Sequence, residues 1–144
     1  MLKLSTTGDN VTVPSKGSRF SAGIDLYASH SIVIPPWERK LINTGLLVQH
    51  IESEHYLRIA PRSGLSVKGI DVGAGVIDSD YRGQIKVILI NSSSKEYNVT
   101  SGDRIAQAIM EKCTVLNTIY VNEEKHTFNF DKERGSGGFG STGK

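Results

Sequence analysis

An antiparallel all-β fold, arranged as a sandwich or barrel, is predicted for this chain of 144 residues. β-Branched residues dominate its apolar content, because Ile and Val together number 25 against 10 Leu. The apolar residues occur in short runs, which clusters of Gly, Pro, Asn, Asp or Ser separate. This combination is typical of short strands joined by tight turns. No segment shows the repeated, capped amphipathic pattern that a long helix requires.

Five apolar runs, each bounded by turn residues, are expected to be strands. They cover residues 31–34, 56–60, 72–77, 85–90 and 118–121.

Residues 103–112 fit two patterns. Ile105, Ala108 and Ile109 lie on one helical stripe, and the content of Ala, Gln and Met favours a helix by propensity. Ile105, Gln107 and Ile109 also alternate with their neighbours, as strand residues do. Because the surrounding segments are all predicted strands, we predict a strand here as well.

Composition and charge limit the class of protein. Leu, Ile, Val and Phe number 39 of the 144 residues, which is enough to build the core of one domain. The formal net charge is +2, so charge gives no support to nucleic-acid binding. The one cysteine, Cys113, excludes an intrachain disulfide and a cysteine-based zinc site.

The apolar segments also bear on location. None approaches the roughly 18 residues that a membrane-spanning helix needs. The start of the chain turns polar at Thr6 and lacks the apolar stretch of a secretion signal. We therefore expect an intracellular protein, cytoplasmic or nuclear, that binds neither membranes nor nucleic acid.

Two parts are expected in the chain, a β domain over residues 1–121 and a C-terminal arm over residues 122–144. The composition shifts at this point, because residues 122–134 are charged and the last ten residues contain five glycines. Such a segment cannot pack a core of its own, so we expect a flexible Gly-rich tail. The spacing G-x-G-x-x-G inside it lacks the flanking strand and helix of a dinucleotide-binding motif.

The tail nevertheless carries groups that bind anions. Glycine-rich backbone offers several N–H groups to phosphate oxygens, and Arg134, Ser141 and Thr142 add side-chain donors. One aromatic residue, Phe139, stands within it. The alternative is a disordered tail with an incidental Phe.

Residues 60–69 form a second candidate patch. Ser63 is suited to cap a short helical turn, and Gly69 to close it. With Arg62 beside it, such a turn would bind an anion. The alternative is an ordinary turn between strands.

Residues 73–83 form a third candidate patch, in which Asp78 and Asp80 follow an apolar strand. If the strand continues, both carboxylates share one face, so that one could act chemically while the other holds the turn. The alternative is a purely structural Asp-rich turn. Two smaller clusters, residues 22–28 and 102–107, each place an acid near apolar residues, where it needs a partner.

Together these five patches resemble the five ordered motifs of the homotrimeric dUTPase family, the deoxyuridine triphosphate nucleotidohydrolases, and are most similar to the eukaryotic and large-DNA-virus branch. Each motif alone is weak, but their order and spacing across residues 22–143 are highly specific. Residues 1–14 match no motif, and residues 52–57 lack the Gly or Pro turn that the family usually places there. The motifs read AGIDLYA (22–28), PRSGLSVKG (61–69), GVIDSDYRG (75–83), GDRIAQ (102–107) and RGSGGFGSTG (134–143).

The resemblance implies a jelly-roll-like β fold, a homotrimer and three active sites at subunit interfaces. It implies hydrolysis of dUTP to dUMP and pyrophosphate with Mg²⁺, which limits uracil in DNA and supplies dUMP for dTMP synthesis. By position, Asp78 would activate the water that attacks the α-phosphorus. Asp25 would reach Mg²⁺ through water, with no direct protein ligand.

The other family roles also follow by position. Main-chain groups between Gly75 and Ile88 would read the uracil edge, Tyr81 would lie under the deoxyribose, and Phe139 would stack on the base from another subunit's tail. The base-reading residues would be Gly75, Val76, Ile77, Lys86 and Ile88. The phosphate-binding residues would be Arg62, Ser63, Gly64, Arg104, Gln107, Arg134, Gly140, Ser141 and Thr142.

Two other functions fit the same features less well. A dCTP deaminase-like relative shares the fold but normally has a longer chain and a differently built active-site acid. A trimer that binds nucleotide without catalysis would have no need of the water-activating Asp78.

Overall fold

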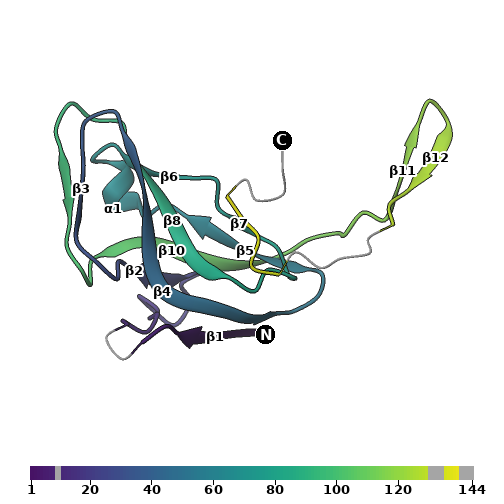
Figure 1. The fold of residues 1–144 in the computed structure, drawn as a ribbon, viewed down its shortest axis with the longest axis horizontal. Coiled ribbons are helices and arrows are strands. Elements are labelled where there is room, and N and C mark those ends of the chain that lie inside the picture. The colour runs from purple at the N-terminus through teal and green to yellow at the C-terminus, as the bar shows by residue number, and fades with distance from the viewer. Residues whose placement is uncertain (9–10, 130–134, 140–144) are drawn as a thin grey trace.

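A computed structural model of the chain describes residues 1–8, 11–129 and 135–139. Within these ranges the molecule consists of strands and one short helix (Figure 1). No described helix is long and apolar enough to cross a membrane. The elements are β1 (Leu2–Thr6), β2 (Ile24–Tyr27), β3 (Ile32–Ile34), β4 (Arg39–Ile51), β5 (His55–Ala60), α1 (Ser63–Ser66), β6 (Ile70–Gly73), β7 (Val76–Ile77), β8 (Gln84–Asn91), β9 (Tyr97–Val99), β10 (Arg104–Lys112), β11 (Thr118–Val121) and β12 (Glu124–Thr127).

Two four-stranded sheets form the body of the molecule. The first has the strand order β1-β4-β8-β6, and the second has the order β2-β10-β5-β7. Two further pairs, β3-β9 and β11-β12, stand outside these sheets, and every strand pair is antiparallel. The predicted antiparallel all-β fold is confirmed.

The core takes alternate residues from strands of both sheets. In β8 every second residue is buried, and Ile85, Val87 and Leu89 are completely inaccessible to water. Leu57 and Ile59 of β5 belong to the same cluster of buried side chains. Burial with a period of two is what strands require when one face of each sheet is buried.

The ambiguous segment 103–112 is a strand, as predicted. β10 lies between β2 and β5, and Ala106 and Ala108 are buried in the core. Two ladders of main-chain hydrogen bonds outweigh the helix propensity of Ala, Gln and Met, which amounts to a few tenths of a kcal/mol per residue.

The expected single strand over residues 72–77 is wrong, because the chain breaks after Gly73. Ala74 and Gly75 adopt positive φ angles of 55° and 108°. This break sends β6 into the first sheet and β7 into the second. The short crossing therefore links the two layers of the fold.

Gly75 is required at this crossing, and we expect Gly75→Ala to lower the free energy of unfolding by about 1–3 kcal/mol. An added Cβ would lie 2.5 Å from the Ile59 carbonyl oxygen, in a left-handed conformation that favours glycine. Urea denaturation measures the change. Gly8→Ala is the control, because a Cβ at Gly8 meets no atom within 4 Å. Equal stability of the two variants would show that the crossing tolerates a side chain.

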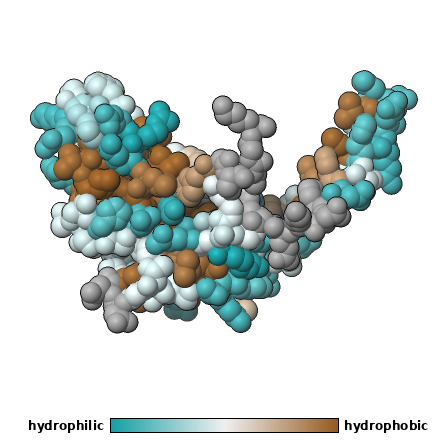
Figure 2. All heavy atoms as spheres, viewed as in Figure 1, coloured by the Kyte–Doolittle hydropathy of each residue, from teal (hydrophilic) through white to brown (hydrophobic). Residues whose placement is uncertain are grey.

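A hairpin made of β11 and β12 projects from the body of the molecule (Figure 1). Its turn residues Asn122 and Glu123 have positive φ angles of 51° and 68°. The expected division of the chain after residue 121 falls in this turn. Apolar surface runs along one side of this projecting hairpin and the segment that leads to it (Figure 2). The exposed apolar residues of this region are Val115, Leu116, Tyr120, Val121 and Phe128.

Candidate functional site

Two separate pockets contain most of the predicted site residues that the structure describes, and they share no lining residue. We call the first, of about 230 Å³, the hairpin pocket; it lies between β7, β8 and the tail. We call the second, of about 270 Å³, the arginine pocket. The hairpin pocket is lined by Ile59, Gly73, Ala74, Gly75, Val76, Ile77, Tyr81, Gln84, Lys86, Val87, Ile88, Gly137, Gly138 and Phe139. The arginine pocket is lined by Gly17, Ser21, Gly23, Asp25, Arg62, Ser63, Gly64, Arg104 and Gln107.

The strand order of the second sheet explains why the residues of the arginine pocket lie together. Asp25 lies on β2, Arg62 follows β5, and Arg104 and Gln107 lie on β10. Because β10 pairs with both β2 and β5, it brings Gln107 opposite Asp25 on one side and opposite Ala60 on the other. Segments far apart in the sequence thus meet at one end of the second sheet.

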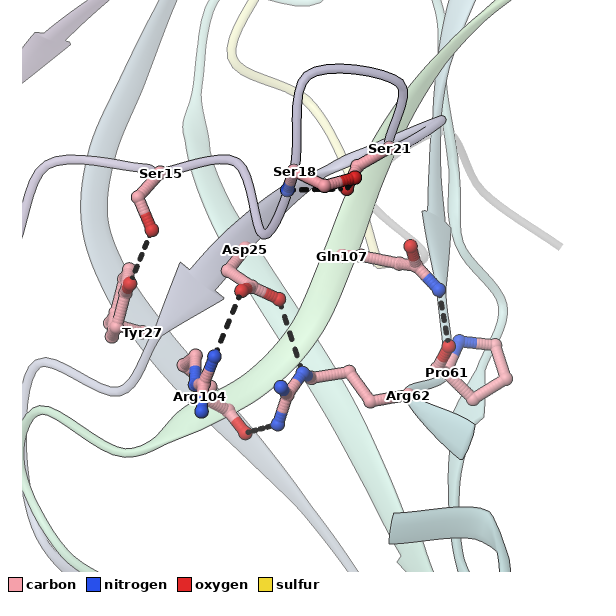
Figure 3. A network of polar contacts seen from close by, with 9 residues as sticks. All are labelled: Ser15, Ser18, Ser21, Asp25, Tyr27, Pro61, Arg62, Arg104 and Gln107. Atoms are coloured by element: carbon pink, nitrogen blue, oxygen red, sulfur yellow. Dashed lines mark hydrogen bonds and ion pairs between the residues drawn. The ribbon is translucent and has the colours of Figure 1, made fainter. Parts of the chain in front are cut away.

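Asp25 connects the two arginines of this pocket (Figure 3). Its Oδ1 accepts from Arg62 Nε at 3.1 Å, and its Oδ2 pairs with Arg104 Nη1 at 3.5 Å. Arg62 Nη1 also donates to the Arg104 carbonyl oxygen at 3.3 Å. The Asp25 and Arg62 side chains are only 13% and 27% exposed, so water screens this pair less than the pair with Arg104, whose side chain is 52% exposed. One carboxylate therefore orients two guanidinium groups and leaves the three side chains with a net positive charge.

The loop after β5 differs from the prediction in its details. The N-cap of α1 is Arg62, with an extended backbone, and no side chain caps this end. The prediction that Ser63 caps the turn is therefore wrong. Gly69 lies two residues beyond the C-cap Val67, at a φ of 79°, instead of directly after it. Ser63 and Gly64 are exposed at the mouth of the arginine pocket.

Two further contacts hold this loop and its strands in place. Gln107 Nε2 donates to the Pro61 carbonyl oxygen at 2.9 Å, which ties the loop to β10 (Figure 3). Between β5 and β10, Glu111 accepts a hydrogen bond from Tyr56 and pairs with Arg58. The bond from Tyr56 lowers the pKa of Glu111 and raises the pKa of Tyr56. β5, which precedes Arg62, and β10, which carries Arg104, are thus fixed to each other by side chains.

Tyr81 forms one wall of the hairpin pocket. It is only 8% exposed, and its hydroxyl donates to the Gln84 carbonyl oxygen at 2.9 Å. Its ring occupies the space beside Gly83, where a Cβ would lie 2.3 Å from the Tyr81 hydroxyl oxygen. The tyrosine therefore supports the turn between β7 and β8 as well as facing the pocket.

Asp78 and Asp80 lie in the turn after β7. The strand ends at Ile77, and Tyr81 N–H donates to the Asp78 carbonyl oxygen at 3.1 Å. The condition under which both carboxylates would share one strand face, a strand that continues past Ile77, is therefore not met. Both residues are half-buried, and Asp78 lines neither pocket of its own chain.

Part of the tail lies against the hairpin pocket. Arg82 N–H donates to the Gly135 carbonyl oxygen at 2.7 Å, and Tyr81 forms a parallel bridge with Gly135. The Phe139 ring lies 5.8 Å from Lys86 Nζ. Phe139 thus contacts the pocket of its own chain, whereas its predicted place is in another subunit. Arg134, Gly140, Ser141 and Thr142 lie outside the described residues.

Sequence reasoning missed part of each pocket. Gly17 and Ser21 line the arginine pocket from the segment before the first motif, and Gly23 lines it within that motif, yet none was assigned a role. The Lys86 side chain was also missed, because only its main chain was expected to bind. No local signal marks these residues, since their role depends on the segments that fold beside them.

No group of three or more His, Cys, Asp or Glu side chains suited to hold a metal occurs among the described residues. Mg²⁺ prefers oxygen ligands, retains several waters, and is usually bound through one or two carboxylates together with phosphate oxygens. The chemistry of a carboxylate fits this ion, and the arginine pocket contains one, that of Asp25.

Comparisons with known proteins identify the family of this chain. A family model described as dUTPase matches residues 9–143. The deoxyuridine 5'-triphosphate nucleotidohydrolase of Yarrowia lipolytica is 47% identical to this chain, and the match covers 99% of this chain and 88% of the relative. The deoxyuridine 5'-triphosphate nucleotidohydrolase of variola virus is 50% identical, and the match covers 90% of this chain and 84% of the relative. A dUTPase variant of Staphylococcus bacteriophage 80alpha, solved with dUpNHpp, has a TM-score of 0.78 and 23% identity, covering 100% of this chain and 99% of its own. This chain therefore belongs to the dUTPase family.

Proposed function

We propose that this chain hydrolyses dUTP to dUMP and pyrophosphate, which limits uracil in DNA and supplies dUMP for dTMP synthesis. Similar proteins that cover most of the chain carry the name deoxyuridine 5'-triphosphate nucleotidohydrolase. The observation that carries the proposal is the division of the motif residues into two pockets of different chemistry. One is walled by strand edges and apolar side chains, and the other holds two arginines.

The hairpin pocket is suited to a pyrimidine base. β7 pairs with β5 on one side only, and the pairing of β8 with β6 ends at Ile88. Unpaired strand edges carry main-chain donors and acceptors, which suit the alternating edge of uracil. We assign this edge to main-chain groups of Gly75, Val76, Ile77, Lys86 and Ile88. Cytosine reverses the pattern and would leave buried groups unpaired, which is a strong basis for rejection.

Contacts around the base and the sugar would exclude thymine and ribonucleotides. A tight fit around carbon 5 would exclude thymine. Tyr81 would lie under the deoxyribose and leave no room for a 2′-hydroxyl, and its buried, hydrogen-bonded position makes this wall rigid. The Phe139 ring would cover the base and exclude water.

The arginine pocket would hold the triphosphate. Arg62 and Arg104 supply guanidinium groups that match phosphate oxygens, and Ser63, Gly64 and Gln107 supply further donors at its mouth. Arg134, Gly140, Ser141 and Thr142 would close on the far end of the substrate. Mg²⁺, when bound to the phosphate oxygens, would offset their negative charge. Asp25 would contact the waters of this ion, because a carboxylate that already pairs with two arginines keeps further acceptor sites.

Asp78 would supply the base. Its carboxylate would accept a proton from a water molecule as the water oxygen bonds to the α-phosphorus. The bond between the α-phosphorus and its bridging oxygen then breaks, and pyrophosphate leaves. A base of this kind contributes about 10²–10⁴ in rate, so charge stabilisation by the arginines must supply most of the remainder.

A homotrimer would unite these parts. Within one chain Asp78 lines neither pocket, and no residue lines both pockets. We propose that the Asp78 turn of one subunit faces the arginine pocket of another. The apolar side of the β11–β12 hairpin supports this assembly, because contact with a second copy of the chain would bury that surface (Figure 2).

A substrate panel tests the reaction. Pyrophosphate and ammonia are measured for dUTP, dCTP, dTTP and UTP in the presence of Mg²⁺. The proposal predicts pyrophosphate release from dUTP, with the other three nucleotides reacting at least about 10²-fold more slowly. Ammonia from dCTP would instead indicate the deaminase, and binding without any product would indicate a non-catalytic trimer.

Mixed trimers test whether the site is shared between subunits. Asp78→Asn and Arg62→Ala homotrimers should each be nearly inactive. After joint unfolding and refolding, mixed trimers should regain a substantial fraction of wild-type turnover, because some sites receive both intact residues from different chains. If mixing restores nothing although native mass spectrometry detects mixed trimers, both residues act from one chain.

Asp25→Asn tests the contact between Asp25 and the two arginines. We expect a roughly tenfold weaker affinity for dUpNHpp, because charge-assisted bonds contribute about 1.5–3 kcal/mol each and only partly persist with the amide. Calorimetry in EDTA measures this effect without metal. Glu96→Gln is the control, since this exposed carboxyl lies outside both pockets. Full affinity in EDTA but a raised Mg²⁺ requirement would assign Asp25 to the metal alone.

A further inference from the structure

We propose that the side chain of Lys86 holds the C-terminal tail over the hairpin pocket through a cation–π contact with the ring of Phe139. Lys86 Nζ lies 5.8 Å from the centroid of this ring, within the distance at which such contacts are attractive. Both residues line the hairpin pocket. The inference deepens the proposed function and rests on it for the identity of the ligand.

The position of Lys86 on β8 directs its side chain toward the tail. Residues of β8 alternate between the core and the opposite face, and Lys86 lies on the same face as Gln84 and Ile88, away from buried Ile85 and Val87. Among the described residues no carboxylate lies within 4.0 Å of its ammonium group. The ring of Phe139 is therefore a partner for the Lys86 ammonium group, which has no ion pair among the described residues.

Before Phe139, the described part of the tail is held at two points. Gly135 is fixed by a main-chain hydrogen bond to Arg82, and Gly138 lies close to the Tyr81 ring. Phe139, however, remains 57% exposed, so burial alone holds its ring weakly. A cation–π contact at an exposed site shifts an equilibrium about two- to fivefold, and a dry one about thirtyfold.

The charge of Lys86 has no other evident use in this pocket. The remaining walls are glycines, neutral polar groups and apolar side chains, and the arginine pocket already holds the cations that suit phosphate. A direct contact between Lys86 and the nucleotide is the competing explanation. The two explanations differ in one respect, because only the contact with the tail requires the Phe139 ring.

Limited proteolysis tests the contact without any nucleotide. Trypsin can release the last ten residues by cleavage after Arg134, and mass spectrometry follows this rate. In the ligand-free protein, Lys86→Met should be cleaved about two- to fivefold faster than wild type, and Lys86→Arg at the wild-type rate. In a Phe139→Leu background, Lys86→Met should cause no further change. Lys112→Met is the control, because it also removes an exposed lysine of a strand, outside both pockets.

Affinity for dUpNHpp provides a second, separate measurement. Lys86→Met should weaken binding about two- to fivefold when Phe139 is present and leave it unchanged in Phe139→Leu. An equal loss in both backgrounds would assign Lys86 to the nucleotide and overturn the proposal, as would wild-type proteolysis of Lys86→Met. If dUTP proves not to be the substrate, the proteolysis result still decides whether Lys86 holds the tail. The measurement applies whichever chain of a trimer supplies that tail.

Discussion

Asp78→Asn should lower the turnover of dUTP by about 10²–10⁴-fold while the affinity for dUpNHpp changes little. Asparagine has nearly the same shape, but its amide cannot accept the proton of an attacking water. The turn that holds residue 78 depends on a main-chain bond from Tyr81, which the substitution leaves intact. Single-turnover pyrophosphate release measures the chemical step, and calorimetry measures the affinity.

Asp80→Asn is the matched control for this prediction. It lies in the same turn, is also half-buried, and undergoes the same loss of charge. We expect its turnover to remain within about tenfold of wild type, because it would act only on the geometry of the turn. An equal loss of turnover in the two variants would mean that catalysis depends on the negative charge of the turn. It would contradict the role of Asp78 as the base.

Deletion of residues 134–144 should lower kcat/KM for dUTP by about 10²-fold or more, without a change in the midpoint of thermal unfolding. The deletion removes Phe139 and the four proposed phosphate-binding residues Arg134, Gly140, Ser141 and Thr142; a single donor of this kind can contribute about 10²–10³ where charge develops in the transition state. It removes no member of the buried core. Steady-state kinetics and calorimetric scans measure the two quantities.

A chain in which residues 134–144 are replaced by a Gly/Ser segment of equal length provides the control for this deletion. It should be as inactive as the truncated chain, since length alone supplies neither the ring nor the donors. Full activity of either variant would show that catalysis does not need the tail. A lowered unfolding midpoint would show instead that the tail stabilises the fold.

Much of the fold could be predicted from the sequence because burial with a period of two is a local property. The strands around Ile85 and Leu57 follow from it directly. The break between β6 and β7 could not be predicted, because its positive φ at Ala74 depends on how the two sheets meet. The cap of α1 was also predicted wrongly, since the extended backbone of Arg62 shifts the start of the helix by one residue.

Many residues that line the two pockets could be selected from the sequence, but their arrangement in space could not. Asp25, Arg62 and Arg104 were each identified from separate motifs, yet their mutual contact depends on β10 lying between β2 and β5. No pattern along the chain reports that spatial order. The Lys86–Phe139 contact escaped prediction for the same reason, because these residues come together only where the tail meets β8.

The crossing at Ala74 and Gly75 has a consequence for how the base would be selected. β7 and β8 border the same pocket but belong to different sheets, so the shape of the pocket depends on how the two sheets pack against each other. Ile59 and Val87 line this pocket and are also buried members of the core that separates the layers. Under the proposed function, the packing of the hydrophobic core would therefore determine how much room the base has at carbon 5, the position at which thymine differs from uracil. Under the proposed function, a substitution that loosened this core would also weaken the selection of uracil over thymine.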